Sequence, residues 1–74
     1  MDINEKILLL GILKKKEDET LMDVVGTLEN TQLFTFKEGK KLLKKLKNEE
    51  FITDGFLTLK GELIAKEVEQ EFKI

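Results

Sequence analysis

The order of apolar and polar residues predicts four helices and one hairpin. The first helix is expected to be capped by Asp2 or Asn4, and it is apolar on nearly every side. A helix that is apolar on every side is buried on every side. In so short a chain one side can face the domain core, and the other side needs a second cover. The two sides are formed by Leu8 with Ile12 and by Ile3, Ile7 and Leu10. We expect at least one of them to contact the C-terminal helix or a second copy of the chain.

A second helix is expected at about residues 21–28, where apolar side chains recur with helical spacing. Thr20 precedes it and Asp23 follows three positions later, which is typical of a helix N-terminus. The next stretch, residues 29–34, is either a polar turn or a short extended piece. In the second case Leu33, Phe34 and Phe36 pack inward.

The third helix is predicted within residues 35–52, TFKEGKKLLKKLKNEEFI. Thr35 and Glu38 form a capping box, in which each side chain accepts a hydrogen bond from the backbone amide of the other residue. An apolar stripe follows, with lysines on the opposite side of the helix. The stripe consists of Gly39, Leu42, Leu43 and Leu46, the opposite face of Lys37, Lys41 and Lys44, and the flanks of Lys40, Lys45 and Lys47. We expect the helix to end near Lys47 or Asn48, since Asn tolerates the left-handed conformation that closes a helix.

A hairpin is predicted next, because Asp54-Gly55 separates the apolar runs 51–53 and 56–59. A type I′ turn suits the twist of the two strands and requires a positive φ at Gly55. Thr58 can then cap a last helix. Its inner side is expected to carry Ile64, Ala65, Val68 and Phe72, and its outer side Glu62, Lys66 and Glu69.

Composition argues against an enzyme. The 74 residues contain no Cys, His, Ser, Tyr, Trp or Pro, and all 13 basic residues are Lys. A hydrolytic triad, imidazole acid–base chemistry and the usual soft-metal sites are therefore excluded. No catalytic residue, metal site or cofactor is predicted. The apolar run at residues 7–13 is too short to span a bilayer, and we expect a cytoplasmic protein without membrane contact.

Charge is unevenly distributed along the chain. Residues 37–47 contain six Lys and one Glu, whereas the remaining residues contain seven Lys and fourteen acidic residues, although the net charge is only −2. Such a division produces a local field that the net charge does not suggest. A solvated helix face is the simplest explanation of the lysines, and a surface for an anionic partner is the alternative.

Two stretches resemble a known family. KKLLKKLKNEEFI is similar to a recognition helix and its exit, and LTLKGELIAKEV is similar to the start of the helix that follows a wing. With the predicted order of helix, helix, helix, hairpin and helix, residues 20–72 resemble winged helix-turn-helix domains of bacterial and archaeal transcription regulators. The resemblance implies one α+β, mainly helical domain over residues 1–74, with three helices, a short two-stranded hairpin wing and a C-terminal helix.

The resemblance also implies a mechanism, because in such domains the third helix enters the major groove of DNA and the wing touches the adjacent backbone. The residues implied to face DNA are Thr35, Lys37, Lys40, Lys41, Lys44 and Lys45, with the wing at Asp54 and Gly55. A small DNA-binding transcription regulator is therefore expected, which can be a homodimer through Leu8, Ile12 or the C-terminal helix. The alternative is a winged-helix module that binds protein and not double-stranded DNA.

Overall fold

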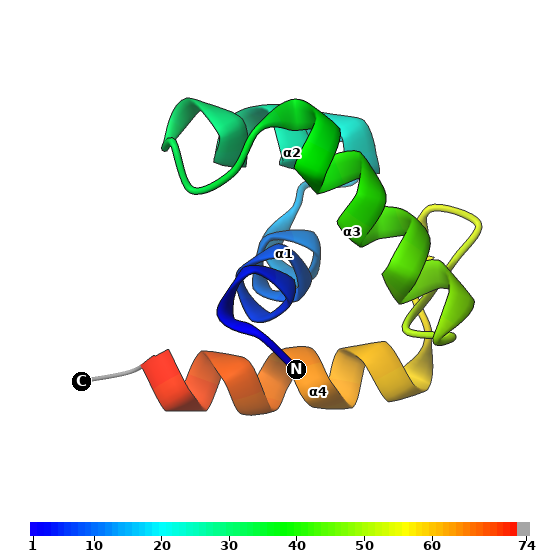
Figure 1. Ribbon diagram of the computed structural model, residues 1–74. Coiled ribbons are helices and arrows are strands. Elements are labelled where there is room, and N and C mark those ends of the chain that lie inside the picture. Colours follow the sequence, from blue (N-terminus) through cyan, green and yellow to red (C-terminus); the bar gives the residue numbers. More distant parts are fainter. Residues whose placement is uncertain (73–74) are drawn as a thin grey trace.

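Four helices and one short antiparallel hairpin make up the computed structural model, which describes residues 1–72 (Figure 1). The elements are α1 (Ile3–Lys14), α2 (Leu21–Asn30), α3 (Phe36–Asn48), β1 (Ile52–Thr53), β2 (Phe56–Leu57) and α4 (Leu59–Phe72). The predicted order of elements and the predicted α+β, mainly helical class are confirmed. No helix among these residues has the length and apolar character needed to cross a membrane.

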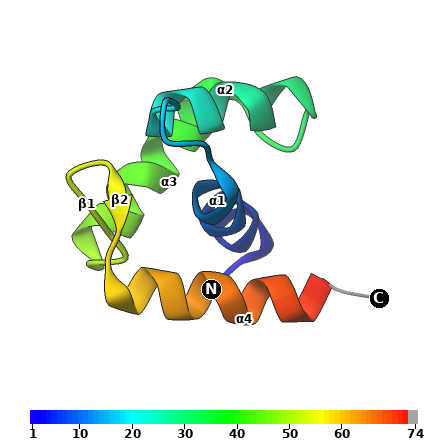
Figure 2. The same ribbon diagram turned by 180° about the vertical axis from the view of Figure 1, so that it is seen from behind.

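Helix α1 lies at the centre of the molecule. Figures 1 and 2 show it between α2 on one side and α4 on the other, with α3 crossing in front in Figure 1. The core side chains come from every element except β2, and they are Leu8, Leu9, Ile12, Val24, Val25, Phe34, Leu46, Phe51, Ile52 and Ala65. Helix α1 carries apolar residues on nearly every side because it contacts three other helices, α2, α3 and α4.

The cover predicted for α1 comes from within the chain. Leu8 is 0% exposed and Ile12 is 4% exposed, and α4 is one of the helices packed against α1. The prediction of contact with the C-terminal helix is confirmed. A homodimer through Leu8 and Ile12 is not supported, since both side chains are buried within the chain.

The first three helices begin at the predicted caps. The Asp2 carboxylate accepts a hydrogen bond from the amide of Glu5 at 2.9 Å. Thr20 with Asp23 and Thr35 with Glu38 both form complete capping boxes. Each box satisfies two amides that a helix start leaves without an intrahelical partner. The directions in which α2 and α3 start are thus fixed by local sequence.

The end of α3 differs from the prediction in one respect. The helix ends at Asn48 as expected, but the left-handed residue is Glu50, with φ of 65°. The amide of Phe51 donates to the carbonyl of Leu46 at 2.9 Å, and that of Glu50 donates to Lys47 at 3.0 Å. This pair of bonds is the Schellman motif, which places the left-handed residue two positions after the last helical one.

The hairpin has the predicted two-residue turn. Ile52 pairs with Leu57 and Thr53 with Phe56, and both Asp54 (φ 48°) and Gly55 (φ 86°) have the positive φ that a type I′ turn requires. The hairpin returns the chain toward the end of α3, where α4 begins.

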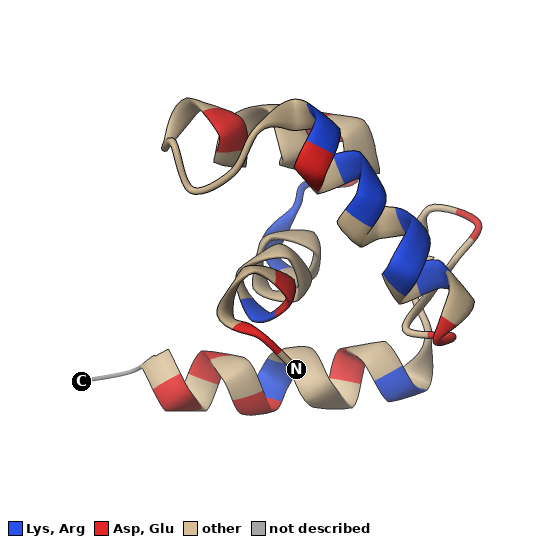
Figure 3. Ribbon diagram, in the orientation of Figure 1, with Lys and Arg blue, Asp and Glu red and all other residues tan. Residues whose placement is uncertain are grey.

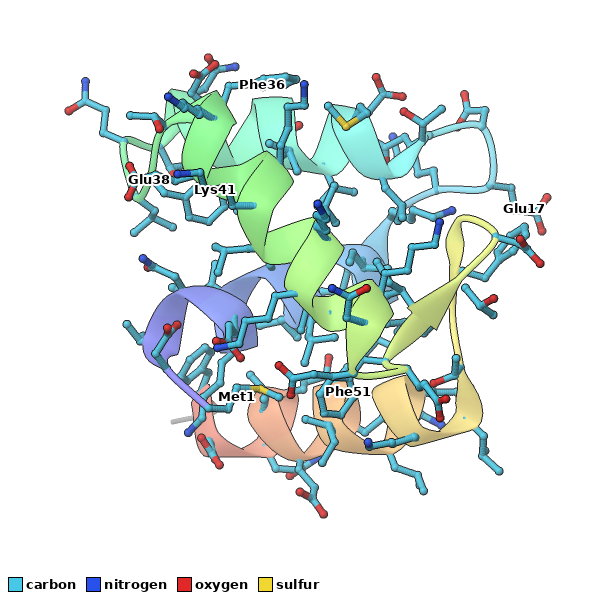
Figure 4. All side chains as sticks on the ribbon, turned by 45° about the vertical axis from the view of Figure 1, so that its right-hand side comes forward. Met1, Glu17, Phe36, Glu38, Lys41 and Phe51 are labelled. Atoms are coloured by element: carbon cyan, nitrogen blue, oxygen red, sulfur yellow. The ribbon has the colours of Figure 1, made fainter. Side chains whose placement is uncertain are left out.

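Thr58 connects the end of α3 to the start of α4. Its hydroxyl donates to the carbonyl of Glu50 at 2.6 Å and accepts from the amide of Gly61 at 3.1 Å, so the predicted cap is confirmed. Figure 4 shows Phe51 between the end of α3 and α4. The hydroxyl therefore joins two helices as well as capping one of them.

Helix α4 buries Gly61, Ala65 and Val68. Phe72, predicted on the inner side, is 41% exposed, because the C-terminal end of α4 extends past α1 (Figure 1). Two leucines on the outer side are also exposed, Leu59 by 75% and Leu63 by 57%.

Candidate nucleic-acid interface

Four lysines of α3 form the most distinctive polar surface of the protein. We call Lys37, Lys40, Lys41 and Lys44 the lysine face, and all four are exposed. Figure 3 shows that blue segments are frequent along α3, while red segments are frequent on α4. The structure thus brings together four of the six residues that the resemblance placed on DNA.

The lysine face is held outward by tight packing on the opposite side of α3. Leu46 is fully buried there, and Gly39 leaves no room for a side chain. A Cβ at Gly39 would lie 2.5 Å from Val25 Cγ1 and 2.9 Å from Phe34 Cε1. This close approach fixes both the depth and the rotation of α3 against the core.

The lysine face has no carboxylate partner within residues 1–72, since none of its ammonium groups lies within ion-pairing distance of an acidic side chain. Other lysines do have such partners. Lys6 pairs with Glu71 at 3.0 Å, Lys14 with Glu69 at 2.5 Å and Lys66 with Glu62 at 2.9 Å. Ammonium groups without an ion pair are therefore grouped on the outer side of α3, although Lys15, Lys16 and Lys60 elsewhere among residues 1–72 also lack one.

Lys45 differs from its neighbours. Its ammonium donates to the carboxylate of Glu5 at 2.5 Å, and the Glu5 side chain is only 3% exposed whereas that of Lys45 is 55% exposed. The hydrogen bond from Lys45 to Glu5, and then the Glu5 charge, raise the pKa of Lys45. Lys45 thus joins α3 to α1, and its ammonium group is bound to Glu5 and is not part of the lysine face.

Thr35 is also engaged within the chain. Its hydroxyl accepts from the amide of Glu38 at 3.1 Å, and its own amide donates to the Glu38 carboxylate at 3.1 Å. Hydrogen bonding of the Glu38 carboxylate to Thr35, first to its backbone amide and then to its side chain, lowers the pKa of Glu38. The amide of Phe36 donates to Glu29 at 2.9 Å. The N-cap amide and the first amide of α3 therefore already have carboxylate partners, at the end of a helix where a phosphate would otherwise bind.

The hairpin lies beside the C-terminal end of α3, and β1 contacts that helix (Figures 1 and 4). Its tip, Asp54 and Gly55, is exposed. Glu49 and Glu50 are exposed at the exit from α3, where Lys47 and Lys60 also lie, so this surface mixes acidic and basic side chains. The two candidate wing residues are thus adjacent to α3, and the one that carries a charge, Asp54, is opposite in sign to the lysine face.

Phe36 also lies on this surface, although no functional role was assigned to it from the sequence. It is half-buried, packs against the core, and lines an open depression together with the lysine face, that is Phe36, Lys37, Lys40, Lys41 and Lys44. Figure 4 shows the Phe36 ring at the N-terminal end of α3. The signal for it was present in the sequence, because Phe36 precedes Lys40 by one helical turn and so shares a face with it.

Comparisons with protein-family models, with curated proteins and with solved structures give no match for this chain. The part of the chain described by the structure also contains no cluster of acidic side chains suited to hold a metal ion. The case for a function therefore depends on the geometry and charge of the α3 surface.

Proposed function

We propose that this protein is a DNA-binding module of the winged-helix type that acts in transcription regulation, with α3 in the major groove of a duplex. The observation that carries the proposal is the lysine face, whose four ammonium groups are exposed and without carboxylate partners among residues 1–72. Lysines in such a position are suited to phosphates, because each contact releases condensed counterions from DNA.

The dimensions of α3 support this proposal. The helix has 13 residues and is therefore about 20 Å long, and a major groove about 12 Å wide admits one α-helix. Because lysine side chains are long and flexible, those at the edges of the inserted face can reach the phosphates on the groove walls. The hairpin beside the end of α3 would then lie near the adjacent backbone.

The protein contains no Arg, the residue with the best bidentate geometry for guanine. Affinity would therefore come mainly from phosphate contacts, which position a protein on the duplex without reading the sequence. We expect a modest sequence preference and a strong dependence on salt.

A protein-binding module is the second candidate, and three acidic side chains at and before the hairpin favour it. Asp54 at the tip and Glu49 and Glu50 at the exit from α3 would repel phosphates, whereas a protein partner can present cations to them and carboxylates to the lysine face. In this case the same helix would bind an acidic polypeptide.

A titration of the protein against a duplex of random sequence at about 50 mM and 200 mM salt distinguishes the two candidates. DNA binding predicts an affinity that falls steeply between these concentrations. Polyglutamate serves as the acidic polypeptide in a parallel titration. Absence of salt-sensitive duplex binding even at the lower salt concentration would overturn the DNA proposal, and tighter binding to polyglutamate would favour the second candidate.

A further inference from the structure

The depression on the outer side of α3 combines one apolar ring with four cations. Its lining consists of Phe36 and the lysine face. Phe36 lies in the first turn of α3, near the edge of the lysine face and on the same side of the helix as Lys40. A duplex whose major groove receives this side of α3 would therefore have its base edges facing the ring.

Two of the six side chains that the resemblance placed on DNA are already engaged within the chain, and the lysine face is left to contact phosphates. The Thr35 oxygen accepts from the Glu38 amide, and Lys45 is paired with Glu5. The Phe36 ring has no polar group, so any part it plays in recognition must come from apolar contact. The 5-methyl group of thymine is the apolar group that a base pair presents in the major groove, and Phe is one of the side chains that contact it.

We infer that Phe36 contacts the 5-methyl group of a pyrimidine in the major groove while the lysine face holds the neighbouring phosphates. This inference rests on the proposed function and adds to it a chemical preference for thymine-containing sites. Thymine in an A·T pair and 5-methylcytosine in a G·C pair carry the same methyl group at the same ring position. Both are therefore ligands of this contact.

The size of the preference follows from the burial of one methyl group. Removing an apolar group of this size from water is worth a factor of about four in affinity. Phosphate contacts do not change when the methyl group is deleted, so the dependence on salt should be the same for methylated and unmethylated duplexes.

The experiment compares duplexes that differ only in the methyl group. The wild-type protein is titrated against an alternating A·T duplex and against the same duplex with deoxyuridine in place of thymidine, and then against a G·C duplex with 5-methylcytosine or cytosine. We expect about fourfold tighter binding to each methylated duplex. The variants are Phe36→Gln and Phe36→Leu, with Lys44→Gln as the matched control on the same helix.

Phe36→Gln should bind all four duplexes with the methyl preference lost, while Phe36→Leu, which preserves an apolar contact with the core, should keep part of it. Lys44→Gln should weaken binding to every duplex and keep the ratio. Equal, salt-sensitive binding of the wild-type protein to methylated and unmethylated duplexes would overturn the inference and leave the proposed function standing. A methyl preference that survives in Phe36→Gln would also overturn it. Absence of salt-sensitive binding to any duplex would overturn the inference and the proposed function together.

Discussion

The buried carboxylate of Glu5 on α1 accepts a hydrogen bond from the ammonium group of Lys45 on α3, at 2.5 Å. The pair joins residues forty positions apart, and its two members differ in exposure, since the side chain of Glu5 is 3% exposed and that of Lys45 is 55% exposed. If the pair is broken, the lysine can turn into water, whereas the carboxylate stays in the protein interior.

This asymmetry predicts that the two members of the pair contribute unequally to stability. Lys45→Met should lower the melting temperature more than Glu5→Gln, because it leaves a buried charge without a partner. Glu5→Gln in the Lys45→Met background should restore part of the loss. Thermal unfolding of the two single variants and the double variant measures the coupling. Equal losses from the two single changes would contradict the asymmetry.

The same pair predicts how stability changes at alkaline pH. Glu5 raises the pKa of Lys45 above its ordinary value of 10.5. A group whose pKa is raised by folding contributes stability that is fully present below the unfolded-state pKa and is lost as pH rises through the folded-state pKa. In urea unfolding, wild type should therefore lose more stability above pH 10.5 than Glu5→Gln does. Parallel pH profiles for the two proteins would show that Glu5 does not shift the Lys45 pKa.

Gly61 predicts a steric requirement at the start of α4. A Cβ at this position would lie 1.9 Å from the carbonyl oxygen of Phe51, which is backbone and cannot rotate away. Gly61→Ala should cost about 3 kcal/mol of unfolding free energy, the upper end of the range for overpacking. Gly26→Ala is the matched control, because nothing lies within 4 Å of its Cβ and Ala favours a helix by about 0.5–1 kcal/mol. Urea unfolding should therefore show opposite signs for the two changes.

Gly55 predicts a conformational requirement in the hairpin turn. Nothing lies within 4 Å of a Cβ at this position, so the cost of a side chain comes from its φ of 86°. Gly55→Val should lose roughly 1–2 kcal/mol of unfolding free energy, the cost of a left-handed conformation for a residue with a Cβ. Gly55→Asn should lose much less, since Asn tolerates this region. Equal stability of Gly55→Val and wild type would show that the tight turn does not form.

The lysine face predicts a change in the salt dependence of DNA binding. If Lys37, Lys41 and Lys44 each contact a phosphate, changing all three to Gln should flatten the log–log salt slope by roughly two to three units. The melting temperature should change little, because these side chains are exposed and unpaired among residues 1–72.

The matched control for this variant changes Lys14, Lys16 and Lys66 to Gln. It removes the same total charge from other surfaces, so it should leave the slope nearly unchanged. The comparison tests the position of the charge, since an equal flattening by both variants would mean that only the net charge matters.

The features that the sequence predicted best depend on neighbouring residues. The Thr35–Glu38 box and the Asp54-Gly55 turn each lie within a few positions, so their residue types alone identify them. The partner of Lys45 was missed because Glu5 is far away in the chain, and nothing in the periodicity of the first helix marks Glu5 as buried. The exposure of Phe72 was missed for a related reason, since how far α4 extends past α1 depends on the packing of helices.

The separation of charge between α3 and the rest of the molecule gives the protein an electric dipole (Figure 3). In the field of a polyanion such a molecule experiences a torque, and it turns before it collides. More of its encounters therefore begin with α3 foremost than random rotation would allow. The association rate constant should then rise as salt is removed, even though the net charge of −2 has the same sign as the polyanion. A protein repelled at long range can in this way be captured at short range in one orientation.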